Sequence, residues 1–337
     1  MKTMIYRFFF TVTMIVATAI NLHAQWKDVY NMHEGLVSVT DNNGLQGYVD
    51  RTGQMVIPCQ WLFARDFSEG LASVNDRNGK WGYIDKTGQL IIPCKWKDAE
   101  SFNEGLAKVK DQNGKFGFID KTGRVVVSCK WNYASAFSEG LAMVTSADNW
   151  KSGFINKTGK LVIPCNWSSA SSFSQGLACV KDNGKWGFIN KNGKLAIACK
   201  WSSAYSFSEG LAKVEDDNRK QGFIDKTGKL VISCKWKFAR SFSEGLAVVE
   251  DDNSKQGFIN KTGKIVIPCS WKKALPFSDG LAKVQDENGK WGYIDKTGKL
   301  VIPCQWKDAN SFYEGRAAVK DESGKYFLID KTGAKVK

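Results

Sequence analysis

Residues 70–96 read GLASVNDRNGKWGYIDKTGQLIIPCKW, and this stretch decides the fold class. A short apolar segment at 71–74 is followed by a cluster of turn residues, NDRNG. The segment WGYID at 81–85 is aromatic and β-branched, which favours a strand. DKTG at 85–88 has the chemistry of a type I turn ending in a left-handed glycine, and QLIIP at 89–93 reads as a third strand closed by proline. The stretch therefore predicts a three-stranded antiparallel meander.

The residues after this meander lead back to the start of the same pattern. Trp96, Ala99 and Phe102 are spaced three apart, which predicts one or two helical turns or an irregular return.

The same unit repeats nine times between residues 26 and 337. The glycine of a Glu-Gly-Leu-Ala-like motif recurs every 34 to 36 residues, at Gly35, Gly70, Gly105, Gly140, Gly176, Gly210, Gly245, Gly280 and Gly315. A tryptophan keeps the same period, at Trp26, Trp61, Trp96, Trp131, Trp167, Trp201, Trp236, Trp271 and Trp306. We expect these tryptophans to pack each unit on the next. A fixed period of this size is typical of stacked repeats, so residues 26–337 are predicted to form one domain.

The expected architecture is an all-β, open, solenoid-like superhelix of nine three-stranded antiparallel meander units. Consecutive apolar residues, as at 90–92 and 161–163, predict that neighbouring units cover both faces of each meander. The ninth unit is altered, with Phe327 where the other units have glycine, as expected of an end cap. The alternative is a closed β-propeller-like ring, but propellers typically have about 4–8 four-stranded blades.

The first 24 residues have the pattern of a secretory signal peptide. Lys2 and Arg7 precede an apolar run at 8–20, and the small residue Ala24 precedes Gln25. We expect cleavage between Ala24 and Gln25, because the apolar run is too short for a comfortable membrane span. An uncleaved anchor is the alternative. The mature chain is then exported, to the periplasm or cell surface of a bacterium, without a membrane span, and its net charge falls from +14 to +12.

The unit at 280–303, GLAKVQDENGKWGYIDKTGKLVIP, resembles the bacterial WG-repeat (KWG-repeat) family, whose unit reads roughly G-L-A-x-V-x-x-x-G-K-W-G-Y-I-D-x-x-G-x-x-V-I-P. The resemblance extends over residues 26–337. It implies an all-β repeat fold of largely undefined role, and it brings no catalytic residues. The chain departs from the family at the tryptophan that names it, where the nine units carry Gln46, Trp81, Phe116, Ser152, Trp186, Gln221, Gln256, Trp291 and Tyr326.

Eight of the nine cysteines occupy one position of the repeat: Cys59, Cys94, Cys129, Cys165, Cys199, Cys234, Cys269 and Cys304. No C-x-x-C pair suggests a metal site. Stacked sheets lie about 10 Å apart, beyond the Cα separation of roughly 7 Å that a disulfide allows, so buried free thiols are favoured. The even number of cysteines at the repeat position, in an exported chain, favours disulfides instead. Cys179 lies outside the repeat position and is predicted to be the more reactive thiol.

No cofactor, metal or set of catalytic residues is predicted. After the signal peptide the only histidine is His33, and no nucleophile motif or phosphate-binding loop occurs. Carboxylates recur in every unit, as turn residues do, whereas a unique acid pair should interrupt the repeat.

The position that varies between units is where we expect function. Its aromatic members, Trp81, Phe116, Trp186, Trp291 and Tyr326, are the predicted ligand-binding residues. The three tryptophans lie three units apart and would align in a superhelix of three units per turn. Block duplication without a shared surface is the alternative.

The sequence favours a non-enzymatic, exported binding or scaffold module for a protein partner at the cell envelope. The alternatives are a glycan-binding or polysaccharide-binding protein that uses exposed aromatic residues, and an envelope hydrolase. A nucleic acid is not expected as partner despite the basic charge, because export removes the usual target. The oligomeric state is left open.

Overall fold

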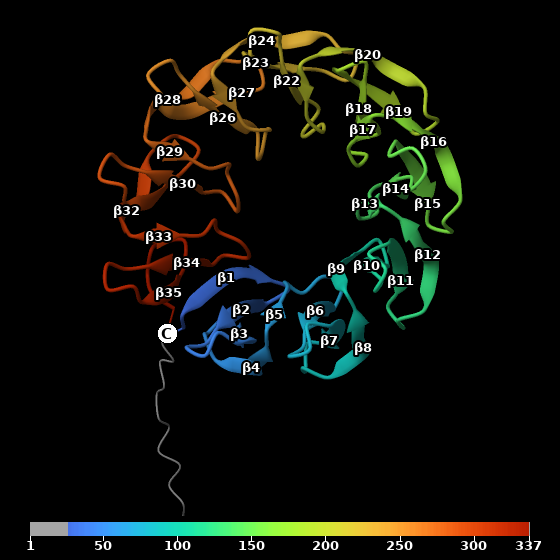
Figure 1. The fold of residues 1–337 in the computed structure, drawn as a ribbon. Coiled ribbons are helices and arrows are strands. Elements are labelled where there is room, and N and C mark those ends of the chain that lie inside the picture. The colour runs from blue at the N-terminus through green and yellow to red at the C-terminus, as the bar shows by residue number, and fades with distance from the viewer. Residues whose placement is uncertain (1–25, 337) are drawn as a thin grey trace, which may run out of the picture.

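The computed structural model describes residues 26–336, and over this range the chain consists of strands and turns. Its 35 strands form nine small antiparallel sheets arranged around a ring, which is a β-propeller of nine blades (Figure 1). The all-β prediction is confirmed. No helix long and apolar enough to cross a membrane occurs between residues 26 and 336.

The strands of blades 1 to 3 are β1 (Asp28–His33), β2 (Leu36–Thr40), β3 (Gln46–Asp50), β4 (Met55–Trp61); β5 (Phe63–Ala64), β6 (Leu71–Asn75), β7 (Trp81–Asp85), β8 (Leu90–Trp96); β9 (Asp98–Asn103), β10 (Leu106–Lys110), β11 (Phe116–Asp120), β12 (Val125–Trp131). Those of blades 4 to 6 are β13 (Tyr133–Ala134), β14 (Leu141–Thr145), β15 (Ser152–Asn156), β16 (Leu161–Trp167); β17 (Ser169–Ala170), β18 (Leu177–Asp182), β19 (Lys185–Asn190), β20 (Leu195–Trp201); β21 (Ser203–Ala204), β22 (Ala212–Glu215), β23 (Gln221–Ile224), β24 (Leu230–Trp236). Those of blades 7 to 9 are β25 (Phe238–Ala239), β26 (Leu246–Glu250), β27 (Gln256–Asn260), β28 (Ile265–Trp271); β29 (Lys273–Ala274), β30 (Ala282–Gln285), β31 (Trp291–Ile294), β32 (Leu300–Trp306); β33 (Asp308–Ala309), β34 (Ala317–Lys320), β35 (Tyr326–Ile329).

Each of blades 1 to 8 has four strands in chain order, from the inside of the ring to its rim. In Figure 1, β13 and β17 lie toward the centre while β12, β16 and β20 form the rim. The helical return predicted from Trp96, Ala99 and Phe102 is wrong, because Trp96 ends β8 while Ala99 and Phe102 belong to β9, the innermost strand of the next blade. Ala99 pairs with Val109 and Phe102 with Ala107, and the irregular register between these pairs produces the spacing of three.

The hydrophobic core consists of clusters between adjacent blades. Tyr83 and Trp96 of blade 2, for example, pack against Phe102, Val109 and Ile119 of blade 3. The same arrangement recurs around the ring. The predicted role of the repeating tryptophan, to pack each unit on the next, is therefore confirmed for blades whose tryptophan lies in such a cluster.

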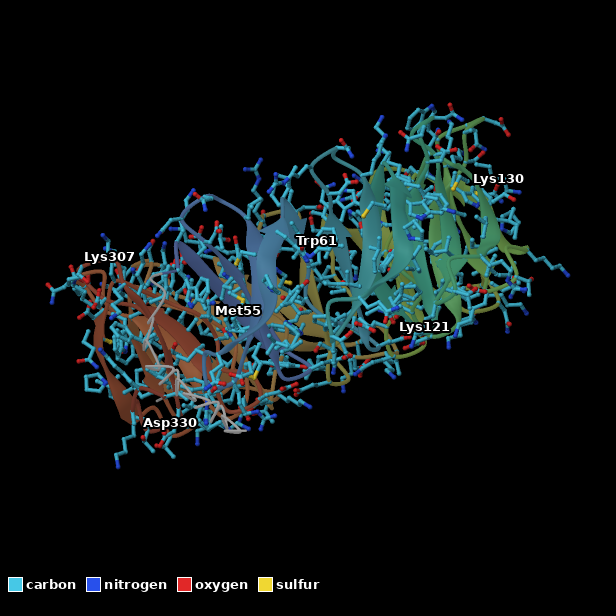
Figure 2. The ribbon with its side chains drawn as sticks, turned by 90° about the horizontal axis from the view of Figure 1, so that it is seen from below. Met55, Trp61, Lys121, Lys130, Lys307 and Asp330 are labelled. Atoms are coloured by element: carbon cyan, nitrogen blue, oxygen red, sulfur yellow. The ribbon has the colours of Figure 1, made fainter. Side chains whose placement is uncertain are left out.

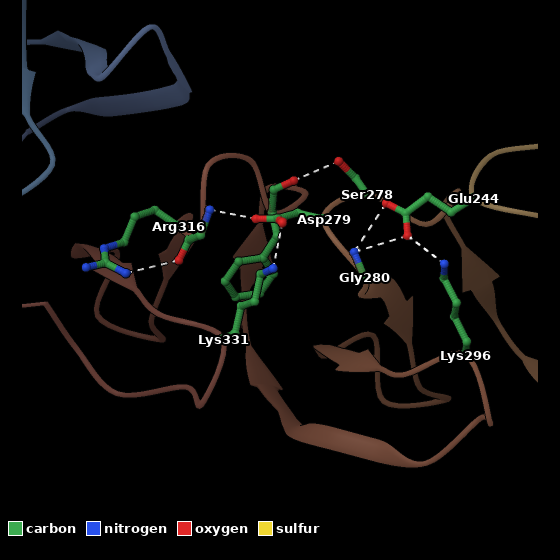
Figure 3. A network of polar contacts seen from close by, with 9 residues as sticks. Glu244, Ser278, Asp279, Gly280, Lys296, Arg316 and Lys331 are labelled. Carbon is green, nitrogen blue, oxygen red and sulfur yellow. Dashed lines mark hydrogen bonds and ion pairs between the residues drawn. The ribbon is translucent and has the colours of Figure 1, made fainter.

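A second link between blades is polar and repeats along one face of the ring. Glu244 has a left-handed backbone, with φ 53°. Its carboxylate accepts a hydrogen bond from Gly280 N at 3.2 Å and forms an ion pair with Lys296 at 3.1 Å (Figure 3). Gly280 and Lys296 belong to the next blade. Left-handed φ is uncommon for glutamate, so we interpret this turn as strain that the contact with the next blade offsets.

The preferred open superhelix is wrong, and the closed ring named as its alternative is confirmed. Blade 9 contacts blade 1 directly: Gly35 N donates to Glu314 at 3.1 Å, and the rings of His33 and Tyr313 stack at 4.7 Å. Ala318 of blade 9 also joins a buried cluster of blade 1 residues. The altered ninth unit, which suggested an end cap, thus forms the closing interface.

The glycine of each third strand marks a close approach within its own blade. A Cβ placed on Gly187 would lie 2.5 Å from Ile197 O, because β20 bulges over β19 at this point. The close neighbour of this glycine is therefore the fourth strand of its own blade and not the following unit. In blade 9, where no fourth strand pairs with β35 within residues 26–336, Phe327 replaces the glycine.

The prediction that both faces of the apolar strand are covered is also wrong in part. Leu90 and Ile91, the first residues of β8, are 43% and 39% exposed. Within the apolar run 90–92, only Ile92 is buried. The strand lies at the rim, where adjacent blades diverge (Figure 1).

Candidate ligand-binding face

The two faces of the ring carry different turns. Figure 2 shows Lys121 and Asp330, which belong to the Asp-Lys-Thr-Gly turns, on one face, and Lys130 and Lys307 toward the opposite face. Each predicted site residue is the first or second residue of its third strand, at the end near Lys130 and Lys307, since Phe116 pairs with Trp131 and Trp291 with Trp306. We call this the aromatic face, defined by Trp81, Phe116, Trp186, Trp291 and Tyr326.

The five side chains are half-buried, and each lies beside a cation. The distances from cation to ring centroid range from 4.2 to 5.8 Å, for Arg65 over Trp81, Lys108 over Phe116, Lys181 over Trp186, Lys283 over Trp291 and Lys320 over Tyr326. Cation–π contacts of this kind restrict the orientation of an aromatic ring, and the half-burial leaves part of each ring exposed.

Where the same position is glutamine, the side chain reaches the next blade. Gln46, Gln221 and Gln256 accept hydrogen bonds of 2.6 to 2.7 Å from the backbone N–H of Ala64, Ala239 and Ala274. These glutamines act as links between blades, and their smaller volume leaves space above them.

Two grooves open where a glutamine blade precedes a tryptophan blade. The first, groove 7–8, has a volume of about 440 Å³ and includes Gln256 of blade 7 and Trp291 of blade 8. The second, groove 1–2, has a volume of about 860 Å³, includes Gln46 of blade 1 and Trp81 of blade 2, and extends to Tyr326 of blade 9. The structure therefore brings Trp81 and Tyr326 to one groove and Trp291 to another.

The three tryptophans predicted to align do not share a surface groove. Trp81, Trp186 and Trp291 lie in the third strands of blades 2, 5 and 8, so a third of the closed ring separates each from the next. The alignment required an open superhelix, which the chain does not form. The sequence also missed Arg65 and Arg240, which line the two grooves, although both belong to the same Phe-Ala-Arg variant of the inner strand.

All nine cysteines are free thiols, as the sequence favoured. The eight at the repeat position are half-buried, and burial raises the pKa of Cys94, for example, to about 11. The expectation that Cys179 is the more reactive thiol is wrong: it is 1% exposed, and burial raises its pKa to about 12. No cluster of side chains suited to a metal ion occurs in the part of the chain that the structure describes.

Comparison with known proteins identifies the repeat. A family model described as WG containing repeat matches eight segments, at residues 47–81, 81–116, 116–150, 153–186, 186–219, 222–254, 257–291 and 291–326. No curated protein sequence matches significantly. Among solved structures, BamB from Moraxella catarrhalis is similar with a TM-score of 0.43 and 11% identity, over 89% of this chain and 95% of that one. The extracellular domain of a hybrid two-component system from B. thetaiotaomicron is similar with a TM-score of 0.30 and 12% identity, over 88% of this chain and 55% of that one.

Proposed function

This chain belongs to the WG-repeat family, and from that premise we propose that it is a non-enzymatic, exported module whose aromatic face binds a protein partner at the cell envelope. The signal-peptide pattern of residues 1–24 supports export, and it lies outside the described residues.

The observation that carries this proposal is the pair of grooves on the aromatic face. Each combines a half-buried tryptophan, an arginine and a glutamine already fixed by a hydrogen bond to the next blade. Tryptophan and arginine are the residues most enriched at the energetic centres of protein interfaces. Two such sites on one rigid ring allow a partner to be held at both, which raises the overall affinity.

The test is affinity capture from the native envelope with matched variants. We expect a defined protein to be retained by the wild-type chain and lost when Trp81 and Trp291 are both replaced by alanine. The control replaces two exposed rim residues, Leu90 and Leu300, by alanine, and should retain the same protein. Equal retention by all three chains would rule out the aromatic face as the binding surface.

A glycan remains the second candidate, because a tryptophan ring beside arginine and glutamine also suits a sugar that stacks and accepts hydrogen bonds. Titration with envelope oligosaccharides, followed by tryptophan fluorescence, separates the two functions. A saturable change that is lost in the Trp81→Ala, Trp291→Ala double variant would favour the glycan.

A further inference from the structure

Groove 7–8 carries more cations than its own carboxylate can pair. Lys237, Arg240 and Lys273 line it, with Glu250 as the one acidic side chain among its lining residues. Both oxygens of Glu250 are engaged, one by the amide of Gln256 at 2.9 Å and the other near Lys237 at 3.8 Å. No ion pair involves Arg240 or Lys273 in the described part of the chain.

Two further lysines lie near the cations of the groove, Lys213 of blade 6 and Lys283 of blade 8. Burial lowers the pKa of Lys213, and the nearby Arg240 lowers it further, although Glu215 acts in the opposite direction. Burial likewise lowers the pKa of Lys283. The carboxylate of Asp308 raises that pKa in part, and the charge of Lys273 lowers it further. Arg240 and Lys273 of the groove therefore each lie near a second cation, an arrangement that an added anion would stabilise.

Arg240 also lacks a partner for a buried donor. Its Nε is buried and donates no hydrogen bond to any residue within 26–336. A buried unsatisfied donor costs free energy, so the residues around Arg240 do not fully compensate its guanidinium. The guanidinium stacks over Phe238 with its carbon 5.3 Å from the ring centroid, which limits its orientations.

We propose that groove 7–8 receives an acidic side chain of the protein partner. The carboxylate lies between Arg240 and Lys273, and the methylene groups of the side chain lie against Trp291 and Leu275, the apolar wall of the groove. Charge-assisted hydrogen bonds from arginine to carboxylate are among the strongest in proteins, and glutamate supplies both the charge and the apolar stem. This inference rests on the proposed function and adds the chemistry of the ligand.

Groove 1–2 provides a matched control within the same chain. It has the same glutamine and tryptophan positions, but Asp28, Asp66 and Asp308 line it, and its Arg65 is paired with Asp98 at 3.1 Å. An acidic peptide should therefore avoid groove 1–2, where carboxylates would repel it.

The experiment is ¹⁹F NMR of the full chain labelled with 5-fluorotryptophan. The resonances of Trp291 and Trp81 are assigned by replacing each with phenylalanine. The probe is a capped peptide with two glutamates between leucines, and its control has glutamines in their place. We expect the glutamate peptide to shift Trp291 alone, with an effect that weakens as salt is added.

Two variants test the assigned cations. Arg240→Gln and the more exposed Lys273→Gln should each weaken binding of the glutamate peptide by about tenfold, which is the loss of one charge-assisted hydrogen bond. Lys273 lies on the surface, so this variant tests the site even if Arg240→Gln destabilises the blade.

Several results would overturn the inference: no shift of Trp291, an equal shift with the glutamine peptide, or a shift of Trp81 instead. A shift with oligogalacturonate but not with the peptide would assign the groove to an acidic polysaccharide. If Arg240→Gln still captures the envelope protein that the tryptophan variants lose, this inference fails while the proposed function stands. If capture does not depend on the aromatic face, the proposed function itself fails.

Discussion

At the scale of single residues, the glycine of the third strand is the most tightly constrained position of the repeat. Any side chain on Gly187 would meet the backbone of Ile197 and Cys199 within 2.5 to 2.7 Å, and backbone atoms in a paired strand cannot move aside. Gly187→Val should therefore lower the free energy of unfolding by about 1–3 kcal/mol, the usual cost of overpacking. Urea denaturation measures this, with Lys194→Ala as an exposed control.

The ninth blade offers the reverse substitution. Because only an isolated bridge, between Ile329 and Lys335, follows β35 in place of a fourth strand, Phe327→Gly should cost mainly the partial burial of one ring. A Gly187→Val protein as stable as the wild type would mean that β20 does not bulge over this glycine.

The buried thiol of Cys179 gives a prediction on alkaline stability. Burial raises its pKa to about 12 in the folded chain, from an ordinary value of 9.0. The folded state therefore holds the proton where the unfolded state loses it, so this contribution to stability is complete below pH 9 and declines as the pH rises toward 12. Unfolding in urea at pH 8 and pH 10.5 should show a smaller decline for Cys179→Ala than for the wild type. An identical decline would contradict the assigned burial.

At the scale of elements, strands and turns could be predicted from the sequence because their signals are local. The run WGYID is β7, and DKTG is the turn before β8. The innermost strand could not be predicted, because two residues such as Phe63 and Ala64 have no periodicity of their own. They form a strand only by pairing with Asn75 and Val74, which lie ten or more residues away.

The candidate site was predicted in part for the same reason. Variation within the repeat identified Trp81, Trp291 and Tyr326, which line the grooves. It could not show that both grooves join a glutamine of one blade to a tryptophan of the next, because that depends on how adjacent blades pack.

The link between blades through glutamate yields a prediction at this scale. In blade 5 the chain itself carries Gln175, which still accepts a hydrogen bond from Gly210 N at 2.8 Å. Glu244→Gln should therefore keep the hydrogen bond from Gly280 and lose only the exposed ion pair with Lys296, at a cost below about 1 kcal/mol. Glu244→Ala loses both contacts, and we expect it to cost about 1–2 kcal/mol. Urea denaturation of the two variants compares them, and equal stability would show that the hydrogen bond contributes nothing.

At the scale of the whole molecule, closure of the ring depends on the angle between successive blades. Every unit obeys the same local rules in an open stack and in a closed ring, so the repeat alone does not distinguish them. The angle follows from how clusters such as Tyr83, Trp96 and Phe102 fill the space between blades, and the successive rotations bring blade 9 into contact with blade 1.

Closure can be measured with a pair of introduced thiols. His33 and Tyr313 stack at 4.7 Å across the closing interface, so a short bismaleimide should link His33→Cys to Tyr313→Cys within one chain. The native thiols should compete poorly at pH 7, because a pKa near 11, as for Cys94, leaves roughly a hundredfold less thiolate than an ordinary thiol. His33→Cys with Tyr133→Cys of blade 4 is the control and should not be linked, because β13 lies elsewhere on the ring (Figure 1). Mass spectrometry of the monomer gives the result: linkage of the first pair alone requires a closed ring, whereas an open stack would leave both pairs unlinked.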